Sequence, residues 1–209
     1  MNVDFVRFNP PAIGDLLQVE DFVVFTQKPE KPEEEKPEGS GEIGGYLLEC
    51  DEVGQLLSGL KKVRKNRLVG VMSSNIKVNK EAVMRKKVDV LLDFPERRID
   101  YATLKLAGEK DVVIELAISK FLNSWGLKRT KIFEETIQTI NVINKFDVPF
   151  VLTSGANKWY ELRSKRQIYE FFSSLGAREK KEQDFMKNLI RRFTDPDHIA
   201  EGLEIIAED

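Results

Sequence analysis

Two carboxylates at the ends of neighbouring apolar segments are the residues of this chain best placed to do chemistry. Asp93 follows the apolar run 88–92, and Glu115 lies near the end of the run 111–116. If both runs are strands of one parallel sheet, the two side chains meet at its carboxyl edge and could act as a general acid and a general base. We favour the alternative that each carboxylate is the ion-pair partner of a nearby lysine or arginine.

Other residue types that carry nucleophilic or metal chemistry are scarce. The chain has a single cysteine, Cys50, and a single histidine, His198. These counts exclude a disulfide scaffold, a cysteine-cluster metal site and a multi-histidine metal site. His198 follows Asp-Pro-Asp at 195–197, which predicts a surface or helix-capping residue. The glycines at 39–45 lack the preceding strand and following helix of a phosphate-binding loop, and no Gly-x-Ser-x-Gly elbow occurs.

The net charge of −2 hides an uneven distribution along the 209 residues. Residues 1–60 carry 4 basic and 13 acidic side chains. Residues 61–192 carry 29 basic and 16 acidic side chains, and residues 193–209 carry 6 acidic side chains and no lysine or arginine. A basic body with acidic ends can bind a polyanion, because the local potential governs contact. The alternative is that these blocks mix in space and leave a neutral surface.

Short apolar runs alternate with amphipathic segments over most of the chain. The pattern predicts strands at 3–8, 22–25, 46–50, 68–72, 88–92, 111–116, 149–153 and 203–206, and helices at 52–62, 80–87, 99–109, 128–145, 164–175, 184–193 and 197–200. Ser164 is a predicted N-cap, and Gly176 ends the helix that it begins. Repeated strand–helix units imply an α/β fold with a parallel sheet, either open and doubly wound or closed as a compact TIM-like (β/α) barrel. The barrel is favoured because 203–206 could return to pair with 3–8.

One insert interrupts this pattern. Residues 28–43, KPEKPEEEKPEGSGEI, contain three prolines and no hydrophobic residue before Ile43, which predicts an exposed, disordered acidic loop within a single domain of residues 1–209. The N-terminus lacks the pattern of a signal peptide, and no run of 18 apolar residues occurs. With one cysteine, these features predict a cytoplasmic protein without a membrane span.

Basic and small polar residues, rather than catalytic groups, gather at the predicted strand ends. Arginine, lysine, serine, threonine and asparagine contact phosphate and ribose well, which favours binding over bond cleavage. Trp125 and Trp159 lie in predicted strand-to-helix loops. They could stack on single-stranded nucleic-acid bases or, more conventionally, pack against the barrel rim.

Several segments carry a family resemblance. The segment 145–159, KFDVPFVLTSGANKW, followed by an arginine-containing turn and a helix to Gly176, resembles archaeal ribonuclease P protein component 3. The 30-kDa subunit of nuclear ribonuclease P is the eukaryotic relative of that family. Segments 88–92, 98–107 (RIDYATLKLA) and 111–116 resemble the preceding units, so the resemblance spans about 66–206 in order.

The sequence departs from the family pattern at a few positions. Arg98 and Tyr101 stand where the family usually has glycine and histidine, so it is open whether Tyr101 replaces a functional histidine. The loop 93–98 is shorter than usual, and the acidic insert replaces a compact connection.

The resemblance implies a barrel related to the metal-dependent PHP phosphoesterases but without their histidine ligands. It implies a protein subunit of ribonuclease P, the ribonucleoprotein endonuclease that removes the 5′ leader of precursor tRNA. In that family catalysis belongs to the RNA subunit and its Mg²⁺ ions, so we expect no catalytic residue, metal or cofactor on this chain. The implied partners are ribonuclease P RNA, which the chain stabilises with a second protein, other protein components (especially component 2), and precursor tRNA through the complex.

The candidate RNA contacts come from two predicted strand–helix units. They are Arg97, Arg98 and Lys105 in the fifth unit and Lys158, Arg163 and Arg166 in the seventh. Their expected role is phosphate neutralisation without base readout. Two alternatives remain: an autonomous PHP-like, metal-dependent phosphoesterase that uses Asp93 and Glu115, and a barrel that binds an unrelated small molecule.

Overall fold

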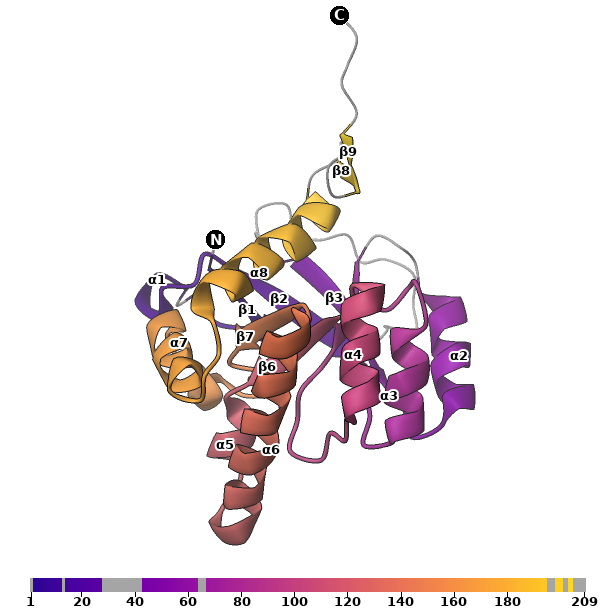
Figure 1. Ribbon diagram of the computed structural model, residues 1–209. Helices are drawn as coiled ribbons and strands as arrows, with labels where there is room; N and C mark the ends of the chain where they lie inside the picture. The colour runs from indigo at the N-terminus through magenta and orange to yellow at the C-terminus, as the bar shows by residue number, and fades with distance from the viewer. Residues whose placement is uncertain are drawn as a thin grey trace, which may run out of the picture.

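A parallel sheet of seven strands, in the same order in space as in the chain, forms the centre of the computed structural model (Figure 1). The structure describes residues 2–12, 14–27, 43–63, 67–194, 198–200 and 203–204. The strands are β1 (Val3–Val6), β2 (Asp21–Gln27), β3 (Ile43–Glu49), β4 (Leu68–Met72), β5 (Val90–Leu91), β6 (Val113–Ala117) and β7 (Phe150–Thr153). All seven agree in place with predicted strands, although β5 is only two residues long.

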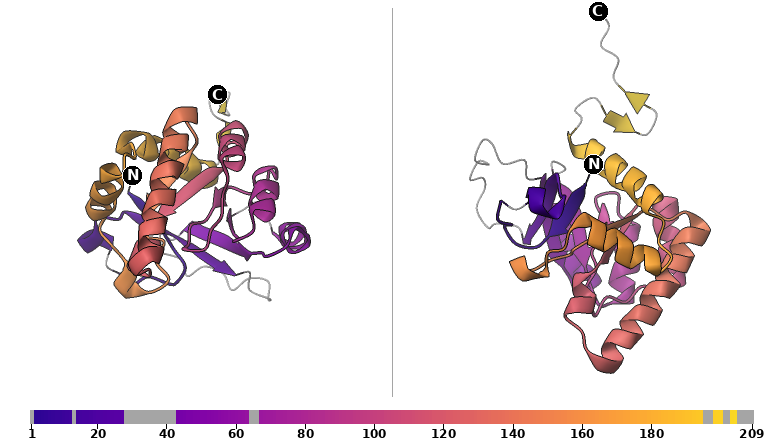
Figure 2. Two further views of the ribbon diagram at one scale, coloured as in Figure 1. Left: turned by 60° about the horizontal axis from the view of Figure 1, so that its bottom comes forward. Right: turned by 90° about the vertical axis from the view of Figure 1, so that its left-hand side faces the viewer.

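Helices follow most of these strands and cover the outside of the sheet (Figure 2). They are α1 (Gly14–Leu17), α2 (Val53–Lys62), α3 (Ile76–Val83), α4 (Tyr101–Lys110), α5 (Ser119–Leu122), α6 (Gly126–Phe146), the 3₁₀ helix η1 (Trp159–Glu161), α7 (Lys165–Ser174) and α8 (Glu179–Thr194). The short elements α1, α5 and η1 were not predicted, because none is long enough to show a helical period.

The predicted ends of α7 are confirmed, and those of α3 are wrong. The Ser164 side chain accepts a hydrogen bond from the Gln167 backbone N–H, and Gly176, with φ +95°, follows the end of the helix. Helix α3 begins four residues before the predicted start at residue 80. Its N-cap is Asn75, whose side chain accepts from the Lys77 backbone N–H.

The sheet closes into a barrel between its first and last strands. Val6 of β1 bridges to Ala156, just beyond β7, and the Arg7 backbone N–H donates to the Ala156 carbonyl at 2.8 Å. The predicted compact TIM-like barrel is therefore confirmed, but the predicted closing pair is wrong. Leu203–Glu204 (β9) pairs with His198–Ala200 (β8) in a separate antiparallel sheet, because β1 already closes against the chain beyond β7.

The chain around His198 also differs from the prediction. Residues 198–200 are strand, so the helix predicted at 197–200, and the capping role of His198 in it, are wrong. Residues 205 and 206 of the predicted last strand lie outside the described residues. The predicted acidic loop falls almost entirely outside them as well, and Ile43 at its end begins β3.

Aromatic and aliphatic side chains fill the barrel interior. Phe5 and Phe25 meet edge to face with ring centroids 5.2 Å apart, and Leu92 packs in the same cluster. Helix α8 lies across the end at which the strands begin, where it contributes Met186 and Leu189 to this cluster (Figure 1). The interior is thus a packed core closed at one end, which leaves the opposite end, where the strands finish, for a site. In the described part of the chain, no helix is long and apolar enough to cross a membrane.

A close approach of the backbone makes one glycine essential to this core. A Cβ atom on Gly70 would lie 2.6 Å from Leu92 Cδ1 and 2.7 Å from Phe25 Cε1. We expect Gly70→Ala to lower the free energy of unfolding by about 1–3 kcal/mol, because it overpacks the interior. Urea denaturation checks this value. Gly54→Ala in α2 is the control: its Cβ would meet nothing within 4 Å, so equal losses in both variants would contradict the packing argument.

Candidate functional site

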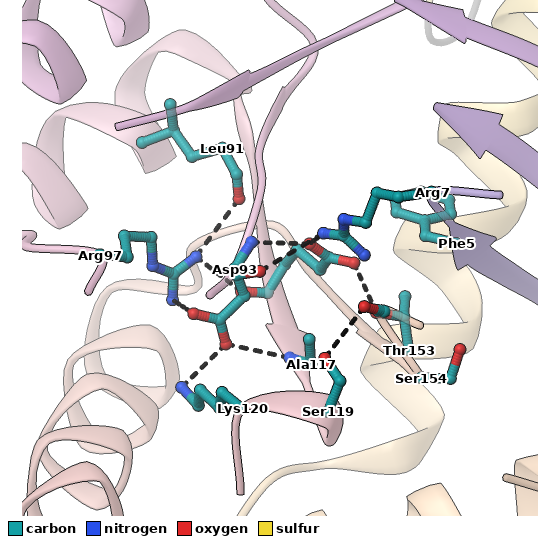
Figure 3. A network of polar contacts seen from close by, with 12 residues as sticks. Phe5, Arg7, Leu91, Asp93, Arg97, Ala117, Ser119, Lys120, Thr153 and Ser154 are labelled. Atoms are coloured by element: carbon teal, nitrogen blue, oxygen red, sulfur yellow. Dashed lines mark hydrogen bonds and ion pairs between the residues drawn. The ribbon is translucent and has the colours of Figure 1, made fainter. Parts of the chain in front are cut away.

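Four strands bring a polar network together at their carboxyl ends (Figure 3). Glu115 on β6 accepts a hydrogen bond from Thr153 Oγ1 at 2.6 Å and, through its other oxygen, from the Asp93 backbone N–H at 2.6 Å. That second oxygen also forms an ion pair with Arg7, which follows β1. The carboxylate of Glu115 thus joins β1, β5, β6 and β7.

Asp93, directly after β5, is held by two cations and a backbone donor. Arg97 Nη2 lies 3.1 Å from Oδ1, Lys120 Nζ lies 2.8 Å from Oδ2, and the Ala117 N–H donates to Oδ2 at 3.0 Å. Burial alone would raise the pKa of Asp93, but the charges of Arg97 and Lys120 outweigh it and hold this pKa below its ordinary value of 3.8. Burial also lowers the pKa of Lys120, and the Asp93 carboxylate opposes this shift.

The network distinguishes between the two roles considered for Asp93 and Glu115, an acid–base pair and ion-pair partners. Every oxygen of both carboxylates has a hydrogen-bond or ion-pair partner, and both side chains are almost fully buried. The ion-pair interpretation is confirmed, and a solvent-accessible acid–base pair is not what these residues form. Three cations, Arg7, Arg97 and Lys120, surround the two carboxylates. Among the described residues, no group of three or more His, Cys, Asp or Glu side chains could hold a metal ion.

A second buried network lies beside the first and fixes β1 against β7. Asp4 Oδ1 accepts from the Ser154 backbone N–H at 2.6 Å, and burial raises the pKa of Asp4. Lys165 Nζ donates to the Leu152 carbonyl at 2.8 Å and lies 3.7 Å from Glu182 of α8. This buried lysine was not identified from the sequence, because Lys165 lies among polar residues, and its neighbours Ser164 and Arg166 are half-buried and exposed.

The six predicted RNA contacts divide into one buried and five accessible side chains. Arg97 is buried: its side chain is 4% exposed and donates to the carbonyls of Leu91 and Glu115 in addition to its pair with Asp93. Because the Arg97 guanidinium has no exposed face for a phosphate, Arg97 is not one of the proposed RNA contacts. Its neighbour Arg98 is exposed.

The other candidates lie on two parts of the surface. Lys158, Arg163 and Arg166 share the segment from the loop after β7 into α7, where Arg163 donates to the carbonyls of Tyr160 and Leu162 and Arg166 pairs with Glu170. Lys105 lies on α4, 3.9 Å from Glu109 and over the ring of Phe146. The structure therefore groups the three residues of the seventh unit and separates Lys105 from them.

A groove of about 480 Å³ lies between α4, α6 and the loop after β5. Arg98, Tyr101, Lys120 and Lys131 are among its lining residues. Tyr101, at the position of the family histidine, is half exposed and meets Phe146 edge to face at 5.4 Å, outside the buried network.

Both tryptophans are exposed at the same end of the barrel. Trp125 is 75% exposed and Trp159 is 68% exposed, so the interpretation that they pack the barrel rim is wrong. The sequence could not distinguish the two alternatives, because a tryptophan in a loop has no periodicity that reports its direction.

The fold and the site define a closed parallel (β/α) barrel with a basic rim, in which ion pairs occupy the strand ends. Comparison with known proteins agrees with this class. A family model described as RNase P subunit p30 matches residues 43–195. Ribonuclease P protein component 3 of Archaeoglobus fulgidus is 41% identical over 202 residues, which cover 97% of this chain and 94% of that protein. The protein of the same name from Methanothermobacter thermautotrophicus is 24% identical over 174 residues, which cover 78% of this chain and 71% of that protein.

Structural comparison gives the same fold. A chain of the cryo-EM structure of archaeal ribonuclease P with mature tRNA matches with a TM-score of 0.80 at 21% sequence identity, covering 100% of this chain and 99% of that chain. The family model and the relative from A. fulgidus together show that this chain belongs to the RNase P subunit p30 family.

The ion pairs of Asp93 predict a pH-dependent stability. Asp93→Asn leaves Arg97 and Lys120 buried without their counter-charge, which should lower the free energy of unfolding at pH 7 by about 3–5 kcal/mol. Because the pKa of Asp93 is below 3.8 in the folded protein, its contribution is present above pH 3.8 and is lost as the pH falls below that value. The difference between wild type and variant should therefore shrink in urea denaturation below pH 3.8.

Glu96→Gln is the matched control, because Glu96 lies in the same loop but its pair with Lys128 is more than half exposed. It should change the free energy of unfolding by less than about 1 kcal/mol. A difference for Asp93→Asn that stays constant from pH 7 to pH 3 would contradict the ion-pair account.

Proposed function

We propose that this chain is a protein subunit of ribonuclease P, the ribonucleoprotein endonuclease that removes the 5′ leader of precursor tRNA, and that it leaves catalysis to the RNA and its Mg²⁺ ions. The observation that carries the proposal is the buried network of a p30-family barrel. Where a barrel enzyme would present reactive groups at its strand ends, Asp93 and Glu115 are neutralised by arginine and lysine. The same features count against an autonomous phosphoesterase.

The rim around this network suits an RNA backbone. Lys158 and Arg163 form no ion pair with a carboxylate in the part of the chain that the structure describes, so their charge is free to neutralise phosphate. Arg166 and Lys105 pair with glutamates of their own helices, and such solvent-screened pairs exchange readily for phosphate. With Arg98, these residues form the proposed contact set.

The proposed partners follow from the same assignment. They are ribonuclease P RNA, at least one further protein component, and precursor tRNA through the assembled particle. Among the protein components, we propose component 2 as the direct partner. We place the protein in the cytoplasm and assign it no cofactor of its own.

Reconstitution tests the function directly. Cleavage of precursor tRNA in Mg²⁺ is measured for this protein alone, and for the cognate RNA and other protein components with and without it. We expect no cleavage by the protein alone and a higher rate only in the complete particle. Cleavage by the isolated protein would overturn the proposal in favour of a phosphoesterase.

The RNA contacts predict a change in salt dependence. Combining Lys158→Ala, Arg163→Ala and Arg166→Ala removes three candidate phosphate contacts, which should reduce the slope of log affinity against log salt by about 2–3. Fluorescence anisotropy with labelled cognate RNA measures the slope. The control combines Lys86→Ala, Lys110→Ala and Lys187→Ala, three exposed lysines outside the proposed rim. An equal change in both variants would show only a general loss of positive charge.

A further inference from the structure

The side chains of the two exposed tryptophans take no part in the buried network or in the hydrophobic core. They are the only tryptophans of the chain, and both lie in connections at the carboxyl ends of adjacent strands: Trp125 is the N-cap of α6, beyond β6, and Trp159 begins η1, beyond β7. Figure 1 shows the start of α6, beside Trp125, projecting at the end of the molecule opposite α8. Large apolar side chains exposed together on one rim are characteristic of a binding surface.

One neighbouring side chain contacts each indole, and a hydrogen bond to a backbone carbonyl supports each contact. Arg129 donates from Nε to the Ser124 carbonyl at 2.7 Å, which fixes its guanidinium 4.6 Å from the centroid of the Trp125 ring. Trp159 meets Tyr160 edge to face at 6.0 Å, and Arg163 donates to the Tyr160 carbonyl. A ring ordered in advance loses little conformational freedom when a ligand stacks on it.

A buried glutamate connects the two loops. Glu161 is 4% exposed, and its carboxylate accepts from Asn123 Nδ2 at 3.0 Å and from the Asn157 backbone N–H at 2.7 Å. Asn123 and Glu161 each lie two residues from a tryptophan, so this hydrogen bond fixes the two indole-bearing loops relative to each other.

The charges around the indoles favour a polyanion. Arg129, Lys158 and Arg163 make no ion pair with a carboxylate within the described residues. The nearby acids are already engaged: Glu96 pairs with Lys128, and Glu161 is buried. Exposed aromatic rings interspersed with uncompensated cations are the combination that binds single-stranded nucleic acid.

We infer that Trp125 and Trp159 are two stacking positions for unpaired RNA bases, and that the neighbouring cations contact the connecting phosphates. The inference rests on the proposed function and adds to it a preference for single-stranded over duplex RNA. In a duplex the faces of the bases are already stacked, so only a strand with unpaired bases can present them to the indoles.

Intrinsic fluorescence tests the inference without a label, because both tryptophans of the chain belong to the proposed site. The full-length protein is titrated with a 12-nucleotide oligo(A) and with a blunt duplex RNA of the same length. We expect quenching by the single strand and little by the duplex. Trp125→Phe and Trp159→Phe leave one reporter each, and each remaining tryptophan should still be quenched by oligo(A).

Affinity gives a second measurement. Trp125→Ala and Trp159→Ala should each weaken binding of oligo(A) by about 5- to 100-fold, since stacking contributes this factor per base, with an unchanged salt slope. Leu127→Ala is the matched control, because Leu127 is 90% exposed in the first turn of α6, two residues after Trp125, but has no ring. Circular dichroism confirms that each variant is folded.

The possible failures are distinct. Binding of oligo(A) by anisotropy without quenching, or equal quenching by the duplex, would overturn base stacking while leaving the proposed function in place. Quenching by a purified protein component of the particle, and not by RNA, would assign the surface to a protein partner instead. No RNA binding by the chain, together with no stimulation of the reconstituted particle, would overturn both proposals.

Discussion

The neutralisation of two buried carboxylates is the interaction on which the rest of this structure depends. Glu115 and Asp93 lie where β1, β5, β6 and β7 end, and each would be costly to bury without its counter-charge. Their partners follow three different strands: Arg7 lies after β1, Arg97 in the loop after β5, and Lys120 in α5 after β6. The same contacts therefore satisfy the charges, position the loops and hold the first strand beside the last.

This arrangement separates the inside of the barrel mouth from its rim. Inside, every carboxylate oxygen of Asp93 and Glu115 has a partner, whereas Arg7 Nε and Nη1 are buried without a hydrogen-bond partner among the described residues. On the rim, adjacent side chains point outward: Arg98 is exposed directly beside the buried Arg97, and at the start of α7 Arg166 is exposed directly beside the buried Lys165. A barrel built in this way is suited to recognising a large anionic partner, since its charged surface is spread around the mouth rather than concentrated in a cavity.

The local features of this fold were readable from the sequence, and its long-range pairings were not. All seven strands and the Ser164 cap follow from short apolar runs and hydrogen-bonding types that act within a few residues. Arg7 and Glu115 are 108 residues apart, and no local pattern connects them. The apolar pattern at 203–206 likewise does not identify a pairing partner: β9 pairs with the neighbouring β8 rather than with the distant β1.

Side-chain direction in loops was the other point at which sequence reasoning failed. Arg97 and Arg98 are equivalent by composition, and the turn in which the Arg97 N–H donates to the Phe94 carbonyl sends one inward and the other outward. The exposure of Trp159 likewise depends on η1, a three-residue helix with no sequence period. A resemblance to a family supplied the function, but it could not supply these orientations.

The closure of the barrel also constrains how the chain folds during synthesis. The contact of Asp4 with Ser154 joins residues 150 positions apart, so the ring cannot close until about three quarters of the chain has left the ribosome. Until then β1 has an unpaired edge, and the interior around Phe5 and Phe25 lacks its α8 cover until residues 179–194 have emerged as well. The nascent chain is therefore most exposed to aggregation late in translation, and a delay shortly before residue 154 would prolong that state more than one near the N-terminus.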